Sequence, residues 1–392
     1  MEHQVRFNNY ISQVEPSKSV VLSAKLREMI REGKDVVNLT GGEPDFDTPK
    51  PVCEEAIRQI LSGNTHYGDS KGDPQLRGEI SAKLAADNGI HCHPDNILVT
   101  PGGKYAIYLI IQSLINPGDE VIWLTPGWVS YPSIVTLCGG IPIAVHLERK
   151  NGYAITCSRL EANTSCRTRL LIINYPNNPT GAILTGEDVS QIKEYLRRHP
   201  DVYCLSDEIY EKIIYDRNRN YSLASDPEFS DRIITVNGFS KFSAMTGWRI
   251  GYMAADPQII NACLKIFQHS MSCVSGFIQK AAITALHMSE ETERMRLAYE
   301  TRRNIIYEGL KSINKVSFKK PAGSFYAWVK FETDLQSEEL CSLLLEKSGI
   351  GGIPGSAFGE ENECMIRFCY AASEDTIMKF VDRLGDFCRH AI

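Results

Sequence analysis

The chain has 392 residues, of which 43% are hydrophobic and 23% charged, and this composition suits one large globular domain with a smaller one. Its 42 lysines and arginines against 48 aspartates and glutamates give a net charge of −6 without a long basic run, so we expect no nucleic-acid partner. No apolar run reaches transmembrane length, and residues 1–7 lack the apolar core of a signal peptide. Twelve cysteines without a Cys-x-x-Cys pair are typical of reduced thiols, and we therefore expect a cytoplasmic protein without a membrane partner.

Short apolar runs alternate with segments of helical period through the middle of the chain. Seven runs have the length and content of strands, at residues 96–100, 120–124, 141–145, 170–174, 202–206, 233–236 and 250–254. Segments such as 106–114 and 187–198 predict helices between them. This alternation predicts an α/β fold in which helices cover both faces of a mostly parallel seven-stranded sheet. Ligands of such sheets bind beyond the carboxyl ends of the strands.

The last part of the chain, from about Tyr299, has a different pattern. A charged helical segment is followed by an apolar segment at 321–329, a helix at 337–347, a glycine-rich loop at 351–355, a short strand around Arg367 and a final helix. This order predicts a smaller α+β domain. We expect three parts: residues 1–50 packed with the small domain, residues 51–298 as the large domain and residues 299–392 as the small C-terminal domain.

The segment His91-Cys92-His93 contains side chains that bind metals. It is flanked by Gly89 and Pro94, which favour a surface turn between a helix and a strand. We therefore expect a turn here and no metal site.

Chemically useful side chains follow the predicted strand at 233–236. Ser240 and Lys241 come directly after it, and Arg249 lies eight positions beyond the lysine. A lysine held at the end of a strand can form an imine with a cofactor aldehyde, while a serine and an arginine hold the cofactor phosphate. The alternative for Lys241 taken alone is an ordinary loop lysine in water.

Two other strand ends deliver polar groups to the same edge of the predicted sheet. The strand at 170–174 is followed by Asn178, and the strand at 202–206 is followed by Asp207 and Tyr210. Each residue also has a purely structural alternative: a helix N-cap for Asp207, core packing for Tyr210 and a turn before proline for Asn178.

A pair of glycines lies between the first predicted strand and the helix after it. The strand at 96–100 runs into Pro101, Gly102, Gly103 and Lys104. The first N–H groups of a helix have no partner within the helix, so this turn predicts an anion site suited to phosphate.

With these residues placed, the chain resembles the class I aminotransferases, which are pyridoxal-phosphate (PLP) enzymes of fold type I. The resemblance is strongest to the bacterial-type aspartate and aspartate/prephenate aminotransferases, and it extends from about Val14 to the C-terminal helix. The motifs that carry it lie at residues 38–49, 176–181, 206–211, 240–241 and 245–252. It implies a large PLP-binding domain and a small α+β domain.

The resemblance implies a role for each residue that would hold the cofactor. Lys241 resembles the lysine that bonds to the cofactor aldehyde, and Asp207 the carboxylate that pairs with the pyridine nitrogen and keeps the ring electron-withdrawing. Tyr210 and Asn178 resemble the pair that hydrogen-bonds the ring hydroxyl, and Trp128 the aromatic stacked on the ring, with core packing as its alternative. The contacts implied for the phosphate come from Gly103, Lys104, Ser240 and Arg249, and from Tyr67 across a homodimer interface.

The same resemblance implies a substrate site. Arg367 resembles the arginine that binds the substrate α-carboxylate through its two-pronged guanidinium, with a surface salt bridge as the alternative. Gly42 would let the backbone approach that carboxylate, and Lys104 matches a lysine that helps to recognise a distal acidic group. The implied substrate-binding set is Gly42, Lys104, Trp128, Asn178 and Arg367.

The expected reaction is PLP-dependent transamination by a ping-pong mechanism. The resemblance implies aspartate or glutamate as the amino acid and 2-oxoglutarate or oxaloacetate as the oxo acid. Residues 16–19 resemble those of prephenate-accepting relatives, so an aromatic, prephenate-like or specialised biosynthetic amino acid stays open. A PLP-dependent β-lyase on the same fold and a non-catalytic cofactor-binding module also stay open, and the absence of a basic DNA-binding segment disfavours the module.

Three departures from the family pattern bear on specificity. Lys71 is unusual so soon after Tyr67, and Cys369 stands where a serine often does. Gly127 stands where a tyrosine is frequent, and its small size is expected to enlarge the pocket. None of the three removes a catalytic group.

Overall fold

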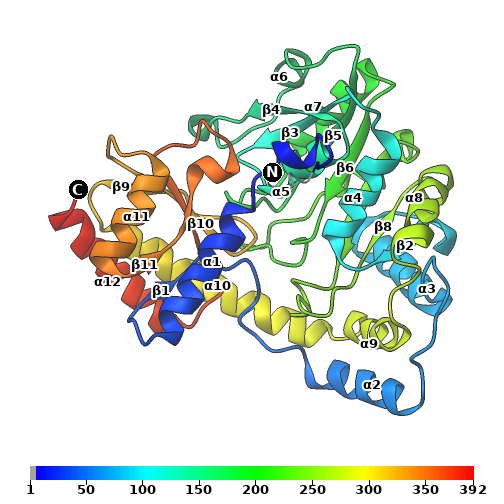
Figure 1. Ribbon diagram of the computed structural model, residues 1–392, viewed down its shortest axis with the longest axis horizontal. Helices are drawn as coiled ribbons and strands as arrows, with labels where there is room; N and C mark the ends of the chain where they lie inside the picture. The colour runs from blue at the N-terminus through cyan, green and yellow to red at the C-terminus, as the bar shows by residue number, and fades with distance from the viewer. Residues whose placement is uncertain (1–5) are drawn as a thin grey trace, which may run out of the picture.

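A seven-stranded sheet lies at the centre of the larger part of the molecule in the computed structural model, which describes residues 6–392 (Figure 1). The expectation about a signal peptide at residues 1–7 falls mostly outside this range. All seven strands predicted from the sequence are present, with ends that differ by at most two residues. They are β2 (Ile97–Thr100), β3 (Glu120–Thr125), β4 (Ile141–His146), β5 (Thr168–Asn174), β6 (Tyr203–Asp207), β7 (Ile233–Gly238) and β8 (Gly251–Ala254).

The strands follow the order β2-β8-β7-β6-β5-β3-β4. Strands β4, β3, β5, β6 and β7 pair in parallel, whereas β8 is antiparallel to both β2 and β7. The prediction of a mostly parallel sheet is therefore confirmed. Asn174 pairs with Asp207, and Asp207 pairs with Val236, so the carboxyl ends of β5, β6 and β7 lie side by side.

Both faces of this sheet are buried under helices. In β3, Val121 and Trp123 belong to the core on one face, and Ile122 and Leu124 to the core on the other. Burial on both faces explains why the strands read as continuous apolar runs rather than as alternating ones. The helices of this part are α2 (Lys50–Leu61), α3 (Pro74–Lys83), α4 (Gly103–Leu114), α5 (Ser130–Leu137), α6 (Cys157–Glu161), α7 (Gly186–Arg198), α8 (Pro257–Ser270) and α9 (Gly276–Leu286).

Local sequence signals explain where two of these helices begin. At the start of α7, the Thr185 hydroxyl accepts from the Asp188 amide at 3.1 Å, and the Asp188 carboxylate accepts from the Thr185 amide at 2.9 Å. This reciprocal capping satisfies two donors that the helix itself cannot. Helix α4 begins directly after Gly102, whose φ of +86° is open to glycine and strained for other residues.

A four-stranded sheet of order β12-β13-β10-β9 forms the centre of the smaller part. Its core also contains apolar residues of the helices around it. The loop predicted at 351–355 is wrong in part, because this stretch contains strand residues that pair with β1 and β13. The elements are α1 (Lys18–Arg31), β1 (Val37–Asn38), α10 (Ser289–Lys311), β9 (Val316–Phe318), β10 (Tyr326–Phe331), α11 (Ser337–Ser348), β11 (Ile350–Gly351), β12 (Ile353–Pro354), β13 (Met365–Cys369) and α12 (Glu374–His390).

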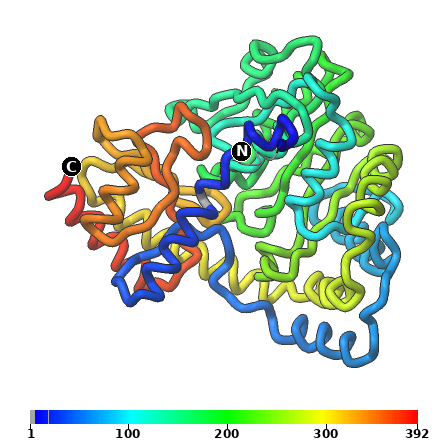
Figure 2. Tube along the Cα trace, in the orientation of Figure 1, coloured from blue at the N-terminus to red at the C-terminus, as the bar shows by residue number. Residues whose placement is uncertain are grey.

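Helix α1 and strand β1 lie beside the C-terminal part of the chain (Figure 2). Strand β1 pairs in parallel with β11, and Val37 faces Ile350 across the ladder. The long helix α10 runs from the large part into the small one (Figure 1), so the domain boundary predicted at residue 298 falls inside a continuous helix. The division into residues 1–50, 51–298 and 299–392 stays a prediction.

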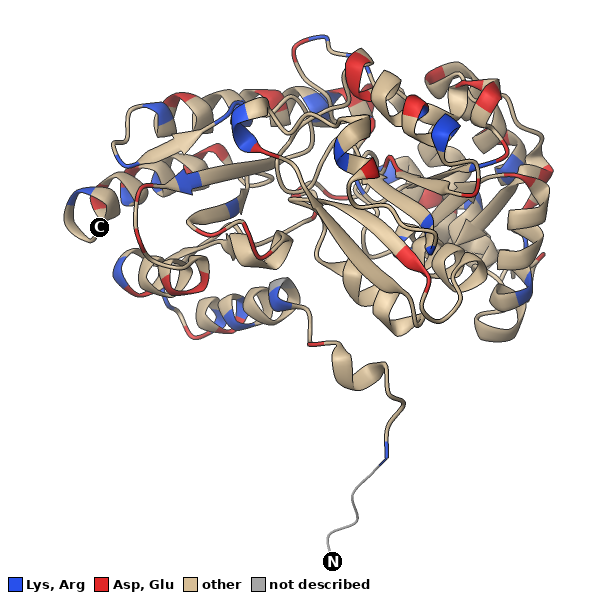
Figure 3. Cartoon of the chain, turned by 90° about the horizontal axis from the view of Figure 1, so that it is seen from above, with Lys and Arg blue, Asp and Glu red and all other residues tan. Residues whose placement is uncertain are grey.

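Acidic and basic residues are interspersed along the helices in the view of Figure 3. Among residues 6–392, no helix combines the length and the apolar content needed to cross a bilayer. The same residues contain no group of three or more His, Cys, Asp or Glu arranged to hold a metal ion. His91, Cys92 and His93 lie in an irregular connection between a π-helix at Leu84–Asn88 and a 3-10 helix at Pro94–Asn96, which precedes β2.

Candidate active site

A cavity of about 470 Å³ opens at the carboxyl ends of β5, β6 and β7. The turn between β2 and α4 closes one side of it, and β10 and β13 of the small sheet contribute to another. All but one of the predicted site residues line this cavity, namely Gly42, Gly103, Lys104, Trp128, Asn178, Asp207, Tyr210, Ser240, Lys241, Arg249 and Arg367. The exception is Tyr67.

Lys241 reaches into the cavity from the turn after β7. Its Nζ donates to the carbonyl oxygen of Gly42, and it lies 5.8 Å from the ring centroid of Tyr210 and 5.9 Å from that of Phe325. Burial lowers the pKa of this amine from 10.5 to about 8. A lysine amine that is easily deprotonated is suited to act as a nucleophile and as a base.

Asp207 is the last residue of β6 and is buried. Its carboxylate accepts from the Tyr131 hydroxyl at 2.7 Å and from the Ile209 amide at 3.2 Å. Burial raises the pKa of Asp207 from 3.8 to about 6, while these two hydrogen bonds favour the charged form. No helix begins at Asp207, so the N-cap alternative is wrong, and the carboxylate is free to face a cationic ring nitrogen.

A buried polar network supports the turn after Asp207 from outside the cavity. Lys83 of α3 donates to Glu211 and, at 2.8 Å, to Asn88 Oδ1. The amide of Asn88 donates to Glu211 at 2.6 Å and to Glu208 at 3.1 Å. Burial and the nearby charge of Glu211 raise the pKa of Glu208 to about 7. Because Glu208 and Glu211 flank Tyr210 in the chain, the network fixes the backbone that carries this tyrosine.

The turn between β2 and α4 has the features of a phosphate cradle. A Cβ on Gly102 would lie 2.6 Å from Nη2 of Arg249, so only glycine allows this arginine to approach the start of α4. The guanidinium of Arg249 donates to the carbonyl of Thr246 at 2.9 Å. Ser240 is buried beside Lys241 and lines the same end of the cavity. The unpaired N–H groups at the start of α4, a hydroxyl and a guanidinium together suit a phosphate dianion.

Lys104 and Trp128 lie on the side of the cavity next to this cradle. The Nζ of Lys104 lies 4.9 Å from the centroid of the Trp128 ring, within the range of a cation–π contact. Burial, and then the charge of Arg249, lower the pKa of Lys104. Trp128 is only partly buried and lines the cavity, so one face of its ring is available to a flat ligand.

Arg367, in β13, is buried at 4% exposure. Its guanidinium donates to Asn178 Oδ1 at 3.0 Å and to the carbonyls of Thr40 and Gly41 at 2.9 and 3.2 Å. Its Nε has no hydrogen-bond partner, and no carboxylate of the described residues lies within 4 Å. The alternative of a surface salt bridge is therefore wrong. A buried arginine that contacts only neutral acceptors favours an anionic ligand.

Three of the cavity-lining side chains that were not predicted from the sequence bear on the chemistry of the site. Tyr131 holds Asp207, and its position three residues after Trp128, in the first turn of α5, was an available signal. Tyr326 shares a hydrogen bond of 2.7 Å with Tyr210, but its apolar neighbours in β10 predict only a strand. Arg27 lines the cavity from α1, and nothing in its local sequence distinguishes it from a surface arginine.

The three departures from the family pattern lie outside the cavity wall. The expected enlargement by Gly127 is wrong, because a Cβ there would lie 2.2 Å from the carbonyl oxygen of Leu124, and the glycine therefore serves the backbone turn. Lys71 lies 3.7 Å from Asp95. Cys369 is buried beside Arg367, and burial raises the pKa of its thiol to about 11.

Tyr67 is the one predicted site residue that lies away from the cavity, and it is 91% exposed. It follows α2, whose Leu61 is 82% exposed. Residues 16–18 also lie outside the cavity wall, and the ammonium of Lys18 is paired with Glu338 of α11.

Comparison with known proteins identifies the family of this chain. The family model described as aminotransferase class I and II matches residues 34–384. The chain is 37% identical to a bifunctional aspartate aminotransferase and glutamate/aspartate-prephenate aminotransferase of Petunia hybrida, over 98% of this chain and 83% of that one. It is 38% identical to an aspartate aminotransferase of Geobacillus stearothermophilus, over 96% and 97% of the two chains. The structure of Thermus thermophilus aspartate aminotransferase with maleate superposes with a TM-score of 0.93 at 34% identity, over 98% and 100% of the chains. The chain therefore belongs to the class I and II aminotransferase family, is similar to aspartate aminotransferases, and has pyridoxal phosphate as its implied cofactor.

Proposed function

We propose that this aminotransferase exchanges the amino group between an acidic amino acid, aspartate or glutamate, and 2-oxoglutarate or oxaloacetate, in two half-reactions. The observation that carries the proposal is the charge of the cavity. Two acidic residues and five basic ones line it, although the whole chain has a net charge of −6. The basic residues are Arg27, Lys104, Lys241, Arg249 and Arg367. Such an excess favours ligands with several negative charges.

The residues present fit pyridoxal phosphate. The start of α4 and the guanidinium of Arg249 lie next to each other at the Gly102 turn, where both can hold a phosphate, and Asp207 offers a buried carboxylate at the end of β6. When bound, the cofactor supplies an aldehyde that condenses with amines and a ring that withdraws electrons from the substrate Cα. Asp207 would hold the ring nitrogen, Trp128 would cover one ring face, and Asn178 and Tyr210 would hydrogen-bond the ring oxygen.

Three basic side chains remain for the substrate once Arg249 is assigned to the phosphate and Lys241 to the cofactor aldehyde. Arg367 would bind the α-carboxylate, because its guanidinium is buried without an acidic partner and its Nε is unpaired. Arg27 and Lys104 would attract the distal carboxylate, and both line the cavity. The Thermus relative was solved with maleate, a dicarboxylate, which supports this assignment. A monoanionic substrate would leave one of these positions without a partner.

Lys241 would move the proton at the substrate Cα. Its amine is held at the carbonyl of Gly42, and its pKa of about 8 leaves a useful neutral fraction near neutral pH. Asp207 stays ionised above a pH of about 6, which keeps its negative charge opposite the ring nitrogen. The two groups therefore have the required charge states in the same pH range.

A panel of L-amino acids tests the proposal by following the loss of the cofactor absorbance of the holoenzyme in a single half-reaction. We expect kcat/KM for aspartate and glutamate to exceed that for alanine by about 100-fold, the effect of roughly one charge-assisted contact. Arg27→Gln should lower the value for aspartate more than for alanine, whereas Arg367→Lys should lower both. A preference for aromatic donors, or release of pyruvate and ammonia as by a lyase, would contradict the assignment.

A further inference from the structure

The hydroxyls of two tyrosines meet inside the cavity. Tyr210 follows β6, Tyr326 begins β10, and their oxygens lie 2.7 Å apart. Burial raises the pKa of both phenols, so both are neutral at physiological pH. Two neutral hydroxyls share one proton in their hydrogen bond, and the other proton stays available to a ligand. The spacing of the pair therefore decides whether Tyr210 can donate into the cavity.

Outside the cavity, the segments that carry these tyrosines are joined as a short antiparallel pair. The amide of Tyr215 donates to the carbonyl of Ala322 at 2.9 Å, and the amide of Ser324 donates to the carbonyl of Ile213 at 2.9 Å. Neither segment belongs to a named strand of a sheet. This local pairing sets how far Tyr210 and Tyr326 reach toward each other.

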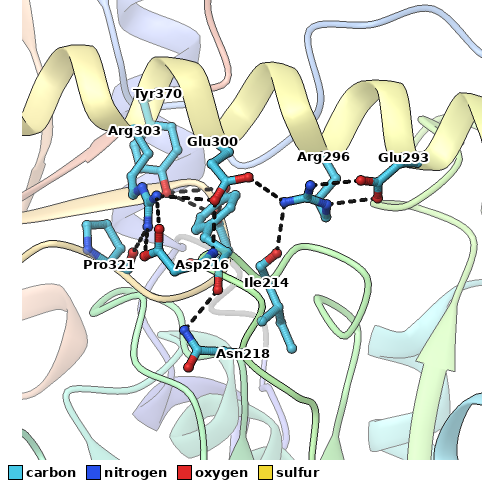
Figure 4. Close-up of polar contacts among 11 residues, drawn as sticks. Ile214, Asp216, Asn218, Glu293, Arg296, Glu300, Arg303, Pro321 and Tyr370 are labelled. Carbon is cyan, nitrogen blue, oxygen red and sulfur yellow. Dashed lines mark hydrogen bonds and ion pairs between the residues drawn. The ribbon is translucent and has the colours of Figure 1, made fainter.

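One buried arginine binds both segments. Arg303 of α10 donates to the two carboxylate oxygens of Asp216 at 2.6 and 2.8 Å and to the carbonyl of Pro321 at 3.2 Å (Figure 4). Its guanidinium also lies 4.7 Å from the ring centroid of Tyr215. The arginine side chain is fully buried, whereas the carboxylate of Asp216 is about half exposed, so the ion pair is shielded from water on the side of the arginine.

The turn bound by Arg303 has an unusual backbone. Asp216 and Arg217 have φ values of +56° and +57°, which residues other than glycine rarely adopt. The amide of Asp216 donates to Glu300 of α10 at 2.9 Å, beside the ion pair (Figure 4). Contacts to α10 therefore hold a conformation that the chain would not adopt by itself.

We propose that Arg303 and Asp216 are positioning residues, whose ion pair clamps the two segments together and so holds the Tyr210 and Tyr326 hydroxyls in hydrogen-bonding register. The proposal rests on the proposed role of Tyr210 toward the cofactor. Neither clamp residue lines the cavity, so both would act through the backbone pairing and the tyrosines.

The matched variants are Asp216→Asn and Glu293→Gln. Both remove the charge of an exposed carboxylate that binds an arginine of α10 through two bonds. Glu293 binds Arg296, which in this variant keeps its own hydrogen bonds to Glu300 and to the carbonyl of Ile214 (Figure 4). Arg303→Lys keeps the buried positive charge but loses the two-pronged guanidinium that binds both oxygens of Asp216. A variant without any cation at this position would leave Asp216 without its partner and could unfold the protein, and Arg303→Lys avoids this.

The readouts are the pH midpoint of the visible absorbance of the cofactor-loaded enzyme, with kcat and KM. For Asp216→Asn and Arg303→Lys we expect the midpoint to shift by about one pH unit and kcat to fall about ten-fold, with KM nearly unchanged. Tyr326→Phe should shift the midpoint in the same direction. Glu293→Gln should match the wild type. Wild-type midpoints in both clamp variants would overturn the proposal and leave the transamination proposal intact.

Hydrogen exchange of the cofactor-free protein tests the clamp without depending on the proposed function. The amides of Tyr215 and Ser324 should exchange about ten-fold faster in Asp216→Asn than in the wild type or Glu293→Gln. If the wild type failed to react with any amino acid, the proposed function would fall and this measurement would still test the clamp. Equal exchange in all three proteins would overturn the clamp.

Discussion

At the scale of single residues, the main feature is a lysine and a carboxylate whose pKa values are shifted toward each other by burial. The pKa of Lys241 falls to about 8, and that of Asp207 rises to about 6. Between these values Asp207 is ionised, and a fraction of the lysine amine is neutral. Shifted pairs of this kind are typical of active sites, where one group must be charged while another takes up a proton.

The rate at which the cofactor-free protein takes up pyridoxal phosphate should follow the neutral fraction of Lys241. With a pKa of about 8, roughly one-tenth of the amine is neutral at pH 7 and roughly nine-tenths at pH 9. We therefore expect the uptake rate to rise about ten-fold between pH 7 and pH 9 and then to level off. Stopped-flow absorbance measures this rate. A rate that still rises steeply from pH 9 to pH 10 would mean that Lys241 titrates as an ordinary lysine.

Residue roles could be predicted where the chemistry is local in the sequence. Lys241 follows β7 and Asp207 ends β6, so their edge of the sheet could be inferred from chain order alone. Tyr326 could not be inferred, because its contact with Tyr210 joins residues 116 positions apart across two sheets. Arg27 was missed for the same reason, since only the packing of α1 brings it to the cavity.

At the scale of elements, the connection between β2 and α4 determines how an anion can be held. Gly102 has φ +86° and ψ +161°, a region open essentially to glycine alone, and Arg249 approaches the space where a Cβ would be. Arg249 itself has a φ of +53°. Two uncommon backbone conformations thus face each other across the cradle. Their energetic cost is consistent with a ligand-binding role for this turn.

Gly102→Ala should weaken cofactor binding about ten-fold or more, because the new methyl group displaces Arg249 and one charge-assisted contact is lost. Gly118→Ala is the matched control, since Gly118 has a φ of +91° and its Cβ would meet nothing within 4 Å. Each variant should lose about 1–3 kcal/mol of unfolding free energy from backbone strain, measured by urea denaturation. Titration of each cofactor-free variant with pyridoxal phosphate should show weaker binding for Gly102→Ala only. Equal cofactor affinities of the two variants would contradict the proposal that the Gly102 turn holds the phosphate.

Elements buried on both faces were the easiest to predict. The apolar run at 170–174, for example, lies within β5. A short continuous apolar segment bounded by turn residues is typical of a buried strand, so its sequence predicts the element directly. The short strands β11 and β12 were missed, since the glycines at 351 and 352 weaken any strand signal. A Cβ on Gly352 would lie 2.5 Å from Ile366, so close packing in the sheet, which the sequence does not reveal, explains these glycines.

At the scale of the whole molecule, the cavity lies where the two sheets meet. Lys241 and Asp207 come from the large sheet, and Arg367 from the small one. Helix α10 connects the two parts, and the Arg303 ion pair ties it to the segment after Tyr210. A change in the relative position of the two sheets would therefore move the substrate-binding arginine relative to the reactive lysine.

Exposed apolar side chains on α2 and near it support the proposal of a homodimer. Ile57 and Leu61 of α2 are 56% and 82% exposed, and Tyr67, which follows, is 91% exposed. Large apolar side chains grouped on a surface favour contact with another chain. If Tyr67 reaches the phosphate of a second subunit, Tyr67→Phe should weaken cofactor binding about ten-fold, while light scattering should still report a dimer.

A mixture of two defective variants tests whether each site is shared between subunits. Lys241→Ala removes the reactive amine, and Tyr67→Ala removes the contact proposed across the interface. In a mixed dimer, one site would combine the intact Lys241 of one subunit with the intact Tyr67 of the other, and the second site would lack both. At a cofactor concentration too low to load Tyr67→Ala alone, refolding the two variants together should therefore restore up to about a quarter of the wild-type activity, because about half of randomly paired dimers are mixed. If Tyr67 acts within its own subunit or not at all, the mixture should be no more active than its separate components.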